Sequence, residues 1–115
     1  MANLEFATAI PQQTITPGSA FTLDIHAHEI GGSNFNWTGY TPKAILLARG
    51  TTITVSGTVV SAGGGTATFT WTAEQTATLS TARWGGILCY ADPTAGTQNL
   101  VIGGVSFRTA ETVIP

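Results

Sequence analysis

Two histidines spaced two residues apart form the part of the sequence that most resembles a metal site. His26 and His28 lie in an alternating segment, and side chains at i and i+2 of a strand lie on the same face of its sheet. Two imidazoles in this arrangement can bind zinc or copper, and Asp24 or Glu29 could add an oxygen ligand. The sequence has no other histidine. We therefore interpret the pair as the polar face of an amphipathic strand, and we predict no metal and no other cofactor.

The single cysteine is the second candidate for chemistry. Cys89 follows Ile87 and Leu88 and precedes Tyr90, and apolar surroundings of this kind raise the pKa of a thiol and make it unreactive. We predict a small core residue, not a nucleophile assisted by a histidine. One cysteine also excludes an intramolecular disulfide, which fits folding in a reducing cytoplasm.

The remaining motifs carry no enzymatic signature. The six acidic residues are spread along the chain, and no two of them lie in the context of an acid–base pair. Three glycines at residues 63–65 lack the lysine and the helix of a phosphate-binding loop. Residues 36–38 match the N-glycosylation pattern, but the N-terminus lacks the basic and apolar regions of a secretory signal. We predict that the protein is not an enzyme.

A glycine- and asparagine-rich loop at residues 29–41 contains three aromatic residues, Phe35, Trp37 and Tyr40. Such a loop either packs over the end of the domain or forms a contact surface for a partner. Trp and Tyr are enriched at the energetic centres of protein interfaces, and flat rings also bind the apolar faces of sugars. We predict a protein contact through these three residues, with a carbohydrate-binding module for host adhesion as the alternative.

Composition and charge restrict the classes of partner. Of 115 residues, 43% are hydrophobic and only 9% are charged, and the net charge is −2. The four cations are scattered, so we predict no binding to nucleic acid. No apolar run is long enough for a membrane span, so we predict no membrane contact. A surface so poor in charge favours a protein that is covered by its neighbours in an assembly.

The segment at residues 66–92 organises the predicted fold. It begins with strict alternation, in which Phe69 and Trp71 point to one side and threonines point to the other. Thr72 and Gln75 then have the spacing of a capping box, which predicts one helical turn. An apolar strand follows at residues 83–91. A strand, a helical turn and a strand can carry the chain from one sheet of a sandwich to the other.

Further strands are predicted at residues 20–28, 43–49, 51–60 and 99–108, separated by turn signals such as Pro17-Gly18. Gly57 marks either a bulge or a bend between sheets, and Gly103-Gly104 marks a bulge. In the last strand Val101 is expected to share a face with Val105 and Phe107. The predicted core consists of Phe21, Phe69, Trp71, Trp84, Leu88 and Phe107.

Residues 1–13 are predicted to form an extended N-terminal arm. Leu4, Phe6 and Ile10 have the same parity, and Pro11 ends the run. The arm is either the first strand of the domain or a strand that pairs with a neighbouring subunit, and we predict Leu4 and Phe6 as contact residues. The domain proper covers residues 14–109, and residues 110–115 form a tail. The fold class is all-β, an immunoglobulin-like antiparallel β-sandwich of about seven strands with one short helical turn.

This layout resembles the N-terminal domain of bacteriophage baseplate upper proteins. The resemblance covers residues 16–108 and rests on loose spacings of strand and turn residues, namely Pro17-Gly18 before Phe21-Thr22-Leu23, Trp37-Thr38-Gly39-Tyr40, Gly65-Thr66-Ala67-Thr68-Phe69, and Gly103-Gly104 before the last strand. It implies a virion protein without enzymatic activity, either a capsid decoration (cement) protein or a tail or baseplate adaptor. The implied partners are the major capsid protein or tail and baseplate subunits, with a homo-oligomer such as a trimer in the assembly. The expected location is the virion, after folding in the host cytoplasm.

Overall fold

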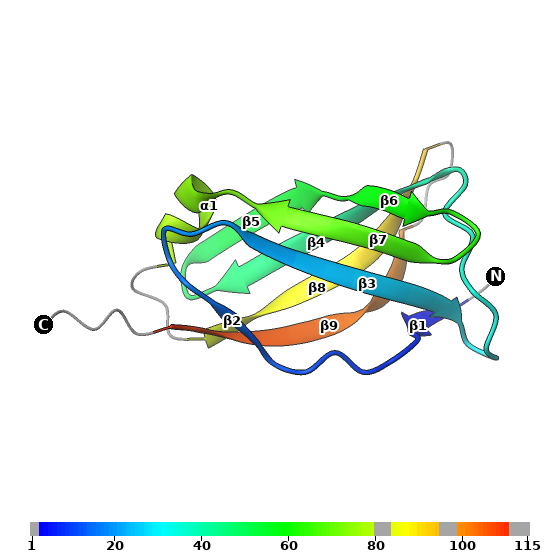
Figure 1. Ribbon diagram of the computed structural model, residues 1–115, viewed down its shortest axis with the longest axis horizontal. Helices are drawn as coiled ribbons and strands as arrows, with labels where there is room; N and C mark the ends of the chain where they lie inside the picture. Colours follow the sequence, from blue (N-terminus) through cyan, green and yellow to red (C-terminus); the bar gives the residue numbers. More distant parts are fainter. Residues whose placement is uncertain (1–2, 80–83, 95–98, 111–115) are drawn as a thin grey trace, which may run out of the picture.

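The computed structural model describes residues 3–79, 84–94 and 99–110. Within these ranges it consists of two packed β-sheets and one short helix, a β-sandwich-like arrangement that confirms the all-β class (Figure 1). The four-stranded sheet has the order β1 (Leu4–Phe6), β3 (Phe21–Glu29), β7 (Thr66–Trp71) and β6 (Thr58–Ser61). The five-stranded sheet has the order β2 (Gln13–Ile15), β9 (Leu100–Thr109), β8 (Trp84–Pro93), β4 (Tyr40–Ala48) and β5 (Thr51–Ser56).

The described residues form nine strands, two more than predicted. The predicted arm contains β1, which pairs antiparallel with β3, and its last residue, Gln13, begins β2, which pairs parallel with β9. The strand expected at residues 51–60 divides at Gly57 into β5 and β6, which belong to different sheets. A Cβ at Gly57 would lie 2.7 Å from the Phe69 ring and 2.6 Å from the Thr68 carbonyl oxygen, so only glycine fits where the chain crosses over the core.

The helical turn that follows β7 begins as the sequence predicts. Helix α1 (Ala73–Ala77) begins with a capping box, in which the Thr72 backbone N–H donates to the Gln75 side chain (2.8 Å) and the Gln75 N–H donates to the Thr72 hydroxyl (3.2 Å). Thr76 of this helix is buried, and its hydroxyl donates to the Ser19 carbonyl (2.8 Å) while accepting from the Gly18 N–H (3.0 Å). The helix is therefore fixed to the turn that precedes β3.

The core between the sheets agrees with the predicted residues at some positions and not at others. Phe69, Trp71 and Phe107 are fully buried, and Phe21 is partly buried against them. Trp84 is 75% exposed and Leu88 only partly buried, so their prediction as core residues was wrong. The reason is the alternation of β8. Its inward side chains are Ile87, Cys89 and Ala91.

The bulge predicted in β9 is present, and it changes which residues face the core. Cys89 pairs with Gly103 but the next residue, Tyr90, pairs with Val101, so Ile102 is the extra residue. Ile102 is consequently buried, whereas Val101 is 55% exposed. The expectation that Val101 shares a face with Phe107 was therefore wrong, because the bulge shifts the parity of the strand by one.

Candidate interaction surface

The N-terminal arm belongs to the sandwich. The Ala7 N–H donates to the His26 carbonyl (2.8 Å), and the Ile30 N–H donates to the Asn3 carbonyl (2.8 Å). Leu4 is buried in the core, and Phe6 packs partly buried against it. Of the two alternatives for the arm, the structure has the one in which it forms strands of the domain. The predicted boundary between residues 13 and 14 falls inside β2.

The aromatic loop packs over the end of the sandwich. Phe35 and Trp37 are only 4% and 1% exposed, and the two rings meet edge to face with their centroids 4.9 Å apart. Tyr40 is partly buried, with its ring 5.1 Å from that of Phe35. The Phe35 N–H donates to the Ala27 carbonyl (2.9 Å), which fixes the loop to β3. The rings of Phe35 and Trp37 are therefore enclosed by their own chain and present no open platform to a sugar or a protein.

The two histidines lie on the outer face of β3. Their rings are 4.8 Å apart at 78°, and the His26 Nε2 atom lies 2.9 Å from the Asn34 Oδ1 atom. His28 is opposite Glu5 in the register of β1 and β3. Within residues 3–79, 84–94 and 99–110, no group of three or more His, Cys, Asp or Glu residues is placed to hold a metal ion. The arrangement is that of two polar side chains on a solvated face.

Cys89 lies in the core between the sheets, as its sequence context predicts. Burial raises the pKa of its thiol to about 12, because the thiolate would lose its hydration there. The protonated, buried sulfur is a packing atom.

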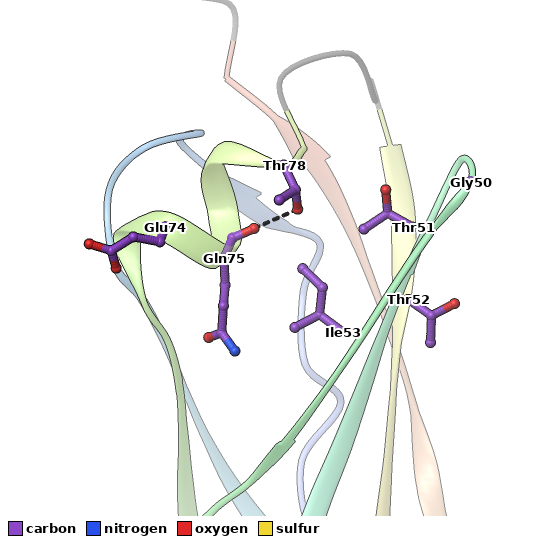
Figure 2. A pocket seen from close by; sticks show the side chains of 7 residues that line it. All are labelled: Gly50, Thr51, Thr52, Ile53, Glu74, Gln75 and Thr78. Carbon is purple, nitrogen blue, oxygen red and sulfur yellow. Dashed lines mark hydrogen bonds between the residues drawn. The ribbon is translucent and has the colours of Figure 1, made fainter.

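An open depression of about 520 Å³ lies between the start of β5 and α1 (Figure 2). The Thr78 hydroxyl donates to the Gln75 carbonyl (2.7 Å), so its proton is used within the helix. The Glu74 carboxylate, the acidic group of the lining, points away from the facing strand residues (Figure 2). The lining presents threonine hydroxyls and one isoleucine side chain, which match no particular ligand chemistry.

The outer face of the five-stranded sheet is apolar over three of its strands, β4, β8 and β9. Leu47 is 47% exposed, Val101 55% and Trp84 75%, and all three belong to strands of this sheet. Between them lie three partly buried apolar side chains that the strand alternation also directs outward. We call this set the apolar face. It consists of Ile45, Leu47, Trp84, Leu88, Tyr90 and Val101.

The register of the strands makes the apolar face continuous. Ile45 pairs with Leu88 across β4 and β8, and Tyr90 pairs with Val101 across β8 and β9. Leu47 is opposite Gly86, and Leu88 is opposite Gly104. Because the two glycines have no side chains, they leave hollows beside the protruding apolar side chains. Charged residues occur at the margins, where Lys43 and Asp92 lie toward one end of the strands and Arg108 lies at the other.

The outer face of the four-stranded sheet is polar over its central strands β3 and β7, whereas Val60 of the edge strand β6 is 67% exposed. Its central pair of strands alternates so that hydrophobic residues point into the core and hydroxyl, carboxylate and imidazole groups point to solvent. These outward residues of β3 and β7 are Thr22, Asp24, His26, Thr66, Thr68 and Thr70.

The sequence did contain a signal for the apolar face. The run of residues 44–48 is apolar at successive positions, and so is the run of residues 87–90. Such runs predict strands that are covered on both sides. A two-layer sandwich covers only one side of each sheet, so such runs leave an apolar outer face. Of the residues in these two runs, the predicted core included only Leu88.

Comparison with protein-family models and with curated proteins finds no match for this chain. Among the residues that the structure describes, no helix has the length and hydrophobicity needed to span a membrane.

Proposed function

We propose that this protein is a non-enzymatic structural subunit of a bacteriophage virion that binds neighbouring protein subunits through the apolar face. The observation that carries the proposal is the open apolar surface formed by β4, β8 and β9. Soluble monomers rarely expose a contiguous apolar patch of more than a few hundred Å², and larger patches mark sites of protein or membrane contact. The low charge of the chain, 9% of residues, agrees with a surface that neighbours cover.

The proposed domain type is immunoglobulin-like. The order β1-β3-β7-β6 matches the A-B-E-D sheet of such domains, and the adjacent strands β9-β8-β4 match G-F-C. Strand β5 then takes the place of the additional C′ strand of the variable type. A departure from antibody domains is the missing disulfide between strands B and F, since the sequence has one cysteine. Packing of Phe69, Trp71 and Phe107 takes over that role in the core.

The resemblance to baseplate upper proteins supports the virion context of the proposal. Two of its quoted motifs lie at element boundaries, with Pro17-Gly18 in the turn before β3 and residues 37–40 leading into β4, whereas Gly103-Gly104 lies within β9. We extend the proposal to a decoration protein on the capsid or an adaptor at the tail or baseplate, with capsid, tail or baseplate proteins as neighbours.

The test measures incorporation into virus particles. A chain with Leu88→Arg places a charge at the centre of the apolar face, and Thr70→Arg places the same charge at an exposed position of the polar face. We expect quantitative mass spectrometry of purified particles to find the wild-type chain and the Thr70→Arg chain at equal copy number. The Leu88→Arg chain should be strongly depleted. Equal incorporation of both variants, or absence of the wild-type chain from particles, would contradict the proposal.

A further inference from the structure

We propose that the apolar face is occupied by a second copy of this chain, packed face to face about a two-fold axis that crosses the strands at Leu88. This inference rests on the proposed role of the apolar face as a subunit contact, and it names the subunit. Three observations lead to it, which are the size of the face, the spacing of its hollows and protrusions, and the distribution of its charges.

The size of the outer face of the sheet approaches that of a subunit interface. The apolar face lies on three strands, which span about 14 Å at a spacing of about 4.8 Å, and about nine residues at 3.3 Å per residue give a length of about 30 Å, or roughly 400 Å². With the shorter edge strands β2 and β5, the whole outer face of the sheet reaches roughly 600 Å². A stable interface buries about 800 Å² on each partner. A second copy of the same sheet offers a surface of equal area, and two sheets pack face to face at a separation of about 10 Å.

The protrusions and hollows of β8 are self-complementary. Gly86 and Tyr90 lie two residues before and two residues after Leu88, and all three positions are on the outer side of β8. A two-fold axis through Leu88 and across the strands therefore places Tyr90 of each copy over the hollow at Gly86 of the other. The two Leu88 side chains meet on the axis. Interfaces of this isologous type are the commonest in homo-oligomers.

The charges distinguish this axis from the alternative axis along the strands. A two-fold axis across the strands brings the end with Asp92 and Lys43 over the end with Trp84 and Arg108. Asp92 then approaches Arg108 of the other copy, and Lys43 lies over the position of Leu47. Rotation along β8 would instead bring Arg108 of one copy over Arg49, which follows β4 on the other side of β8. Like charges across an interface oppose association, and the structure therefore favours the axis across the strands.

The first experiment measures the oligomeric state of the full chain by sedimentation velocity. We expect a dimer at micromolar concentration, and a dissociation constant that Leu88→Arg raises at least about 30-fold, the scale of an interface hot spot. Leu47→Arg provides a second variant at a more exposed position of the same face, and Thr70→Arg is the matched control that should remain dimeric. Circular dichroism spectra establish that each variant is folded. A monomeric wild-type chain, or a dimer that both apolar-face variants leave intact, would overturn the inference.

The second experiment tests the axis with a short bismaleimide cross-linker, which reacts with introduced thiols while the buried Cys89 stays protected. Leu88→Cys should cross-link to itself, and a mixture of Gly86→Cys and Tyr90→Cys chains should cross-link to each other. Gly86→Cys alone should not react, because the two copies of that position lie about 16 Å apart across the axis. Cross-linking of Gly86→Cys alone would contradict the proposed axis.

The two proposals fail in different ways. If Leu88→Arg is lost from particles but the wild-type chain sediments as a monomer, the second copy is ruled out and the subunit-contact role stands. If the chain dimerises through this face but the variant still enters particles, the dimer stands and the proposed function of the face is wrong.

Discussion

The outer faces of the two sheets have the same strand geometry but different chemistry. On the polar face, threonines occupy successive outward positions of β7, where the branched side chain suits an extended backbone and the hydroxyl remains in water. On the apolar face, the equivalent outward positions of β8 and β4 carry leucine, isoleucine and tyrosine. A strand can therefore form with polar side chains, such as threonine, at its outward positions. The difference shows that β4 and β8 carry hydrophobicity beyond what their own fold needs.

The largest expected change in stability comes from adding a methyl group on the inner side of β8, at Gly85, and not on its outer side, at Gly86. A Cβ at Gly85 would lie 2.2 Å from the Leu47 carbonyl oxygen and 2.8 Å from the Phe107 ring, whereas the nearest atom to a Cβ at Gly86 lies 3.8 Å away. Gly85→Ala should therefore lower the free energy of unfolding by about 2–3 kcal/mol, the cost of overpacking a core. Gly86→Ala should change it by less than about 0.5 kcal/mol.

Urea denaturation at one fixed protein concentration measures both values, since association makes apparent stability depend on concentration. Equal losses in the two variants would mean that Gly86 also faces packed atoms, and the boundary of the apolar face would then be wrong.

The next prediction concerns how the buried thiol of Cys89, next to Leu88 in β8, makes stability depend on pH. The pKa of Cys89 is about 12 in the folded chain against an ordinary value of 9.0, so the folded state holds the proton more tightly than the unfolded state. The contribution of this thiol to the free energy of unfolding is complete below pH 9. It decreases as the pH rises from 9 toward 12, by about 1.4 kcal/mol for each pH unit. Cys89→Ala should be less stable at neutral pH because of the cavity, and should lack this part of the alkaline slope.

The position of the thiol gives an independent control. In a Cys89→Ala background, Leu88→Cys should react with an aromatic disulfide reagent in the folded state, since position 88 faces outward. The wild-type Cys89 should react only after denaturation. Rapid labelling of folded wild-type protein would show that the inner side of β8 is open to solvent, contrary to its burial.

The smallest expected change in stability comes from exchanging side-chain polarity between the two outer faces. Leu88→Thr on the apolar face and Thr70→Val on the polar face should each change the free energy of unfolding by less than about 1 kcal/mol, because both positions lie on the outside of a sheet. Binding of an apolar fluorescent dye should decrease in the Leu88→Thr variant and increase in the Thr70→Val variant. A fall in dye binding with both variants would mean that the two faces do not differ as described.

The parts of the fold that follow from local chemistry were predictable from the sequence. The alternation of β7 and the capping box at Thr72 and Gln75 specify a strand and a helix start without reference to the rest of the chain. Gly57 and the Gly103-Gly104 pair were recognised as irregular positions because glycine inside a strand pattern has few other uses.

The candidate surface was not predictable in the same way, because parity fails as a guide in a continuously apolar strand. Leu88 and Cys89 are both apolar, so their order in sequence does not say which of them points inward. In β9 the bulge at Ile102 moves Val101 to the outside, and the exact position of an extra residue depends on pairing with β8. The burial of Phe35 and Trp37 likewise depends on contacts with residues far away in the sequence.

The pairing of β2 with β9 has a consequence for the order in which the chain is made. These strands lie near opposite ends of the sequence, and Ile15 and Phe107 are both fully buried. A growing chain on a ribosome therefore cannot complete the five-stranded sheet until its last strand has emerged, and domains of this kind fold as units after that point. During synthesis β8 lacks its neighbour β9 while its outer side chains are already apolar. The emergence of β9, and not that of the central strands, sets the moment at which the sandwich can close.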